Sequence, residues 1–179
     1  MNIVAFPFLV GAFAVLVVVY LTSIILRESV GTPRMAQIAD YIRVGTKAYL
    51  GRQSKTIAWF IPVLALLLLY FLGWKTAVAF TLGAFLSLLT AYIGMNVVVR
   101  ANVRTANAAR KSSSRALRIA FLGGGVMGLC VTGLSLVGLY LLYVALGELE
   151  PLIGFGFGAS LAAIFAQIGG GIYTKAADI

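Results

Sequence analysis

The chain has 179 residues, of which 61% are hydrophobic and 11% are charged, whereas a soluble domain carries about 25% charged residues. This apolar excess is too large for one buried core, and it indicates that lipid surrounds much of the surface. The net charge of +9 does not indicate a nucleic-acid-binding protein, because the basic residues lie between apolar runs that could span a bilayer.

Apolar runs predict an all-α fold, a polytopic transmembrane helix bundle that forms one domain over residues 1–179. The first run has neither a basic leading region nor a clear cleavage site, so it predicts a retained helix and not a signal peptide. The five predicted spans cover residues 3–26, 56–72, 76–99, 119–146 and 152–173.

The polar segment between the first two spans predicts an amphipathic cytoplasmic helix over residues 33–50. Thr32 and Pro33 form a helix start, with a capping hydroxyl followed by proline at the first helical position. Apolar and polar residues then alternate at helical spacing, which is typical of an amphipathic helix. This helix could lie on the membrane surface, but extending the second span into the cytoplasm is more economical. Only about three residues around Trp74 join the second and third spans, which predicts an antiparallel hairpin.

Basic residues predict the orientation. All of the 14 lysines and arginines except Lys75 lie in segments 27–55 and 100–118 or in the C-terminal stub. By the positive-inside rule these segments are cytoplasmic loops, so the N-terminus is predicted to lie outside and the C-terminus in the cytoplasm.

Glycines are concentrated in the fourth and fifth predicted spans. Gly124 and Gly128 form a pair at four-residue spacing, which predicts close packing between helices in lipid. The Gly-Phe-Gly-Phe-Gly run at 154–158 superficially resembles a dinucleotide-binding loop. It follows no strand, so it does not predict a nucleotide site.

Few residues can carry chemistry. The absence of histidine excludes Ser-His and Cys-His catalysis and zinc sites built on histidine. Cys130 lies alone in an apolar run, where a small core or lipid-facing residue is expected. Glu148 and Glu150 are expected to belong to a solvated turn. No acid lies near the middle of a span, so the sequence shows no ion relay through the membrane.

Lys175 and Asp178 are the remaining candidates. They are three residues apart, so on a continuing helix they share a face at the cytoplasmic end of the fifth span. Lysine can bind phosphate and aspartate can hold Mg²⁺. A solvated pair of charges at a helix end is the more common interpretation of this pattern.

Three stretches of the sequence form a recognisable set. The first is Phe155-Gly-Phe-Gly-Ala-Ser160 followed by Gly169-Gly-Gly-Ile-Tyr-Thr-Lys-Ala-Ala-Asp178, which resembles the fifth-helix signature of membrane-bound pyrophosphatases, the pyrophosphate-energised ion pumps. The exit of that family's third helix is similar to residues 91–106, and the entry to its second helix is similar to residues 48–57. Their order and spacing match over essentially the whole chain.

The resemblance implies a multi-pass integral protein of a prokaryotic plasma membrane or an organellar, vacuolar-type membrane. It implies hydrolysis of Mg-pyrophosphate at the cytoplasmic face, outward transport of H⁺ or Na⁺, and a homodimer with many more spans. Lys175 and Asp178 would hold the substrate, with Asp178 contacting the metal through Mg-pyrophosphate. No catalytic residue is assigned within the chain, and the K⁺ requirement stays open.

The sequence departs from the family at several positions. Gln167 stands where the family usually has an arginine of the gate below the substrate site, so the coupling of hydrolysis to transport is in doubt. Val44 replaces an acid and Ser54 replaces an aromatic residue. The motif stops at Ile179, so we expect the N-terminal part of a pump that lacks C-terminal helices and is inactive alone. The alternatives are a stand-alone five-helix scaffold or partner subunit, and a generic small transporter.

Overall fold

A computed structural model describes residues 5–177 and contains five helices, with no strand in that range. Each helix contains a segment that is long and apolar enough to cross a membrane. The predicted all-α, five-span fold class is therefore confirmed, while the depth at which each helix enters the hydrocarbon stays a prediction. The helices are α1 (Phe6–Arg27), α2 (Pro33–Leu72), α3 (Trp74–Ala109), α4 (Ser113–Leu146) and α5 (Leu152–Ala177).

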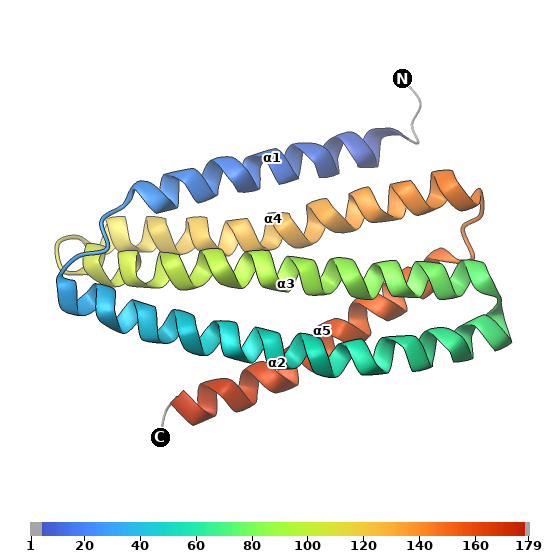
Figure 1. Ribbon diagram of the computed structural model, residues 1–179. Coiled ribbons are helices and arrows are strands. Elements are labelled where there is room, and N and C mark those ends of the chain that lie inside the picture. Colours follow the sequence, from blue (N-terminus) through green and yellow to red (C-terminus); the bar gives the residue numbers. More distant parts are fainter. Residues whose placement is uncertain (1–4, 178–179) are drawn as a thin grey trace.

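The first four helices run alongside one another, and α5 crosses the bundle obliquely (Figure 1). Helix α3 is central, since it packs against α2, α4 and α5, while α1 packs mainly on α4. The α1–α2 and α3–α4 turns lie at one end of the bundle together with the C-terminal end of α5 (Figure 1). We call this the basic end, because the turns there are flanked by Arg27, Arg110 and Lys111. The N-terminal end of α1 lies at the opposite end.

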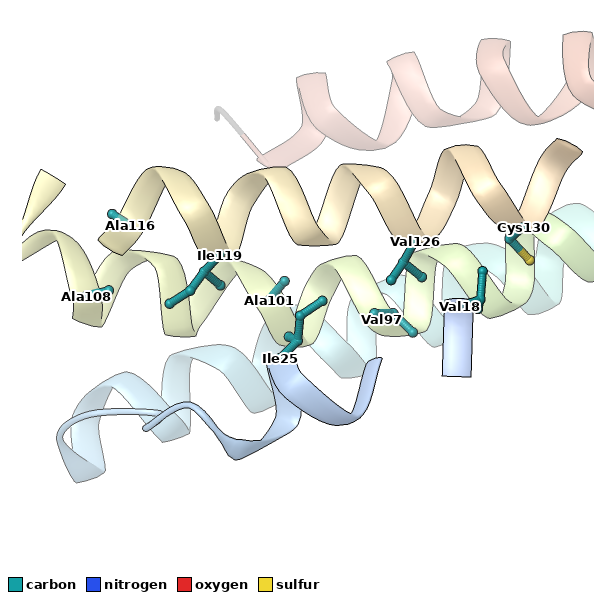
Figure 2. Packing of buried hydrophobic residues seen from close by; sticks show 9 residues of the cluster. All are labelled: Val18, Ile25, Val97, Ala101, Ala108, Ala116, Ile119, Val126 and Cys130. Carbon is teal, nitrogen blue, oxygen red and sulfur yellow. The ribbon is translucent and has the colours of Figure 1, made fainter. Parts of the chain in front are cut away.

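The main core lies between α1, α3 and α4 and consists mostly of small or β-branched side chains. Figure 2 shows these side chains pointing toward one another along the length of the helices. Because small residues allow helix backbones to approach closely in lipid, this packing holds the three helices together. The buried cluster contains Val18, Ile25, Val97, Ala101, Ala108, Ala116, Ile119, Val126 and Cys130.

Helix ends follow the chemistry expected from the sequence. The Thr32 hydroxyl accepts a hydrogen bond from the Met35 amide at 3.3 Å, and Pro33 occupies the first helical position. The amphipathic segment continues without a break into the second span, so α2 is one helix of 40 residues. The Ser112 hydroxyl caps α4 in the same way, and Gly147 ends it with a φ of 70°. A positive φ favours glycine because it has no Cβ.

The segment 100–118, which we expected to be a loop, is mostly helical. Helix α3 continues to Ala109 and α4 begins at Ser113, so only a short turn separates them. The expectation was wrong because charges end a membrane span without ending a helix. Alanine and arginine, which recur in this segment, are good helix formers in water.

A smaller expectation also needs correction. Within residues 5–177, Gly124 and Gly128 do not mark a close approach, because a Cβ at either position would meet open space. Glu148 and Glu150 are exposed in their turn, as expected, and the Glu148 carboxylate also pairs with the Lys75 ammonium at 2.6 Å. This ion pair joins the two turns at the opposite end of the bundle.

Candidate functional site

The candidate residues lie on the last three turns of α5. Lys175 is exposed at the basic end of this helix, and Gln167 is exposed eight residues earlier. A rise of 1.5 Å per residue separates them by about 12 Å along the axis. The structure therefore does not bring Lys175 and Gln167 together. Asp178 lies outside the described residues, so its predicted pairing with Lys175 stays a prediction.

Helix α5 is anchored to α2 directly before Gln167. The Tyr49 hydroxyl donates a 2.6 Å hydrogen bond to the backbone carbonyl of Ala166. The Phe60 and Phe165 rings pack with centroids 5.2 Å apart. These contacts position the backbone from which Gln167 extends. The sequence identified residues 48–57 by resemblance but not this role of Tyr49, because a contact 117 residues apart along the chain leaves no local pattern.

Two glycines of the run 154–158 lie where α5 meets α3. A Cβ on Gly158 would overlap the backbone carbonyl of Phe80, and a Cβ on Gly83 of α3 would overlap that of Phe155. Gly154 likewise lies against Thr76. Gly154 and Gly158 are thus packing positions between two helices, whereas a Cβ on Gly156 would meet open space within the described chain.

No complete Mg²⁺ site is present within residues 5–177. These residues contain no group of three or more histidine, cysteine or acidic side chains that could hold a metal ion. Glu28, at the basic end, is paired with Arg115 at 2.7 Å, and Asp40 is paired with Arg43 at 3.2 Å. Because Mg²⁺ prefers oxygen ligands such as free carboxylates, the described part of the chain does not fit Mg²⁺ by itself.

A cluster of polar side chains lies at the basic end of the bundle, apart from the candidate residues of α5. The Arg104 guanidinium donates to the backbone carbonyls of Glu28 at 3.0 Å and Arg100 at 2.7 Å. Asn107 donates to the Ser29 carbonyl at 3.2 Å. Partial burial lowers the pKa of Arg104, and the positive charge of Arg100 lowers it further. Arginine still stays protonated at neutral pH, so Arg104 neutralises the carbonyl end of α1.

The described part of α5 thus combines an anchored helix with an exposed lysine at the basic end. Comparison with protein families matches residues 12–179 to the family described as inorganic H⁺ pyrophosphatase. The chain belongs to this family. The match covers α2 to α5 and most of α1, so the resemblance seen in three sequence stretches is confirmed over nearly the whole chain.

Individual relatives of this pyrophosphatase family member are pumps. The K(+)-insensitive pyrophosphate-energized proton pump of Methanosarcina mazei is 47% identical over 173 residues, covering 96% of this chain and 26% of the pump. The K(+)-insensitive pyrophosphate-energized proton pump 2 of Moorella thermoacetica is 50% identical over 177 residues, covering 94% of this chain and 26% of the pump. The putative K(+)-stimulated pyrophosphate-energized sodium pump of Clostridium tetani is 46% identical over 179 residues, covering 99% and 27%.

The chain spans about a quarter of the length of these relatives. It corresponds to their N-terminal part and is a multi-pass integral membrane protein. The relatives include forms named for a proton and for sodium, and forms named K⁺-insensitive and K⁺-stimulated. Their names therefore do not assign either ion to this chain.

Proposed function

We propose that this chain is the N-terminal part of a membrane pyrophosphatase that couples hydrolysis of Mg-pyrophosphate to outward transport of H⁺ or Na⁺. The observation that carries the proposal is the family match over residues 12–179. The partner copy in a homodimer and the K⁺ requirement belong to the same proposal, as does Mg²⁺ as the metal of the substrate.

Within this function, the chain supplies a lipid-facing bundle and one wall of the substrate site. Lys175, exposed at the end of α5, would bind a pyrophosphate oxygen as a point charge. Asp178 would add a carboxylate ligand to the Mg²⁺ of Mg-pyrophosphate, which when bound neutralises phosphate charge. The contacts of Tyr49 and Phe60 with α5 hold that wall to the rest of the bundle. Attack of water on phosphorus would need groups that residues 5–177 do not supply.

A chimera tests this assignment. Residues 1–179 replace the matching N-terminal quarter of the Methanosarcina mazei pump, and membranes are assayed for Mg²⁺-dependent release of phosphate from pyrophosphate. We expect hydrolysis in the chimera and its loss in the chimera carrying Lys175→Ala. In the complete protein that contains this chain, the same assay with and without K⁺ tests the K⁺ requirement, and uptake of Na⁺ or formation of a proton gradient identifies the transported ion.

The control is the exposed Arg118, which lies at the same end of the bundle but on α4. The Arg118→Ala chimera should hydrolyse pyrophosphate as well as the parent chimera does. A chimera that inserts into membranes in normal amounts and never hydrolyses pyrophosphate would contradict the proposal, and the scaffold alternative would then lead.

A further inference from the structure

A groove between α2 and α3 at the basic end plays no part in the proposed pyrophosphate site. Its volume is about 380 Å³, and both helices contribute apolar and polar side chains. The lining residues are Arg43, Val44, Thr46, Lys47, Leu50, Tyr92, Met95, Asn96, Val99 and Arg100. The apolar floor and the three cations complement a phospholipid, which has apolar acyl chains and a charged headgroup.

The groove has an unbalanced positive charge. Arg43, Lys47 and Arg100 line it, and no acidic residue does. Only Arg43 has a carboxylate partner, Asp40 at 3.2 Å, which lies on the side of the adjoining groove. Within the described range, Lys47 and Arg100 form no ion pair through their side chains. Two cations are therefore available for an anionic ligand.

The groove lies at the depth of lipid headgroups. Hydrocarbon about 30 Å thick corresponds to about 20 helical residues. Counted from the α2–α3 turn at Gly73, this length ends near Gln53 on α2 and near Gly94 on α3. Lys47 and Arg100 lie about six residues beyond these points, about 9 Å along each helix axis, so their long side chains can reach headgroups, and Tyr92, which is 54% exposed, lies at the boundary. Aromatic residues with one polar atom are typical of this interface.

The apolar part of α2 below the groove is little covered by the rest of residues 5–177. Only 6% of its most apolar window is buried, the smallest share among the five spans. Trp59, on this part of α2, is 79% exposed. Acyl chains can therefore extend along α2 from a headgroup held in the groove.

We propose that this groove binds the phosphate of an anionic phospholipid at the basic end, with Lys47 and Arg100 as the principal contacts. Basic pockets between transmembrane helices bind anionic headgroups in this way. A zwitterionic headgroup carries its own cation and gains less. A soluble phosphate ion could use the same cations but not the apolar floor or the exposed face of α2.

Lipid titration tests the proposal on the complete protein that contains this chain. The protein is purified in mild detergent and titrated with phosphatidylglycerol or phosphatidylcholine, and bound lipid is counted by native mass spectrometry. We expect preferential binding of phosphatidylglycerol. The double variant Lys47→Gln, Arg100→Gln should weaken that binding about 30-fold, since each basic residue near a lipid surface contributes about fivefold.

Two controls separate site binding from general charge attraction. The double variant Arg34→Gln, Arg118→Gln removes two exposed cations from the same end of the bundle, outside the groove, and should bind lipid like the parent. The double variant Lys47→Arg, Arg100→Lys keeps the charge and should retain binding, which shows that the positions tolerate substitution.

Three results would overturn the proposal. One is equal affinity for phosphatidylglycerol and phosphatidylcholine. Another is an equal loss of binding in the two glutamine double variants, which would indicate diffuse attraction. The third is displacement of the lipid by inorganic phosphate at millimolar concentration, which would make the groove a soluble-anion site.

Discussion

Gln167 is a neutral residue at the position where the resemblance implies a charged gate residue. Its side chain is exposed on α5, one residue after the carbonyl that Tyr49 holds. An amide at this position can donate hydrogen bonds but carries no charge. The family resemblance places an arginine here, whose guanidinium forms charge-assisted, bidentate pairs with carboxylates.

Introducing that charge should tighten coupling. In the complete protein, we expect Gln167→Arg to raise the amount of ion transported per pyrophosphate hydrolysed, because a guanidinium can pair with acids that an amide cannot hold. The measurement is ion uptake into vesicles, divided by phosphate release in the same sample. Gln167→Leu serves as the neutral control and should not raise the ratio. An unchanged ratio in the arginine variant would show that Gln167 already supports full coupling.

Arg104 has a structural role at the basic end, because its side chain binds backbone carbonyls and not the substrate. Its guanidinium donates to carbonyls of Leu26 and Glu28 at the end of α1, where helical partners are missing. We expect Arg104→Ala to destabilise the protein by about 2 kcal/mol, as hydrogen bonds from charged groups contribute amounts of this order. The effect should appear as a lower melting temperature in detergent.

Arg118→Ala is the matched control for this prediction. Arg118 is exposed, lies at the same end of the bundle and forms no ion pair within residues 5–177. Its removal should change the melting temperature little. If both variants melt alike, Arg104 contributes only charge and the carbonyl contacts are not stabilising.

At the scale of the helices, glycines show which parts of the fold the sequence can predict. Local rules of capping, hydropathy and spacing predict the number of helices, the start of α2 at Thr32 and the turn at Gly73. The packing faces do not. The pair Gly124 and Gly128 has the favoured spacing and meets open space, because spacing alone does not tell which side of a helix meets a neighbour.

Substitution of glycine by alanine should therefore depend on the face. Gly158→Ala places a Cβ against the backbone carbonyl of Phe80, which cannot move as a side-chain end can. We expect a loss of about 1–3 kcal/mol, the usual cost of overpacking. Gly124→Ala should be neutral or stabilising by up to about 1 kcal/mol, because alanine favours helix. Melting temperatures of the two purified variants provide the comparison. Equal destabilisation would contradict the close approach of α5 to α3.

The sequence predicted only part of the candidate site, because the rest depends on contacts between helices. The motif that ends in Asp178 located Lys175 on α5, since a sequence signature survives without its tertiary context. The anchoring by Tyr49 and the capping by Arg104 depend on contacts between helices far apart in the chain. No local periodicity encodes such contacts, so they emerge only when the helices are placed together.

At the scale of the whole molecule, the two ends of the bundle differ in charge. One end holds the turns flanked by arginine and lysine, and the other holds the ion pair between Lys75 and Glu148. That pair is partly exposed and contributes little stability. The difference matters for insertion, since lysine and arginine near span ends are retained in the cytoplasm.

This asymmetry predicts which side each turn faces, and the chain is well suited to a test with single cysteines. Its one native cysteine, Cys130, is 3% exposed and should stay silent toward a membrane-impermeant maleimide. Leu149, in the α4–α5 turn, is 70% exposed, and Ser113 is exposed next to the α3–α4 turn. In intact cells, Leu149→Cys should react with the reagent, and Ser113→Cys should react only after the membrane is permeabilised.

If only Ser113→Cys reacts in intact cells, the chain has the opposite orientation to the predicted one. The lysine on α5 would then face outward, away from cytoplasmic pyrophosphate, and the proposed function would fail with it. The expected pattern places Lys175 and the lipid groove on the cytoplasmic side, because the C-terminal part of α5 and the N-terminal part of α2 lie at the same end of the bundle as the start of α4 (Figure 1). Pyrophosphate arising in the cytoplasm and anionic headgroups of the inner leaflet would then meet one basic surface, with separate groups of residues for each.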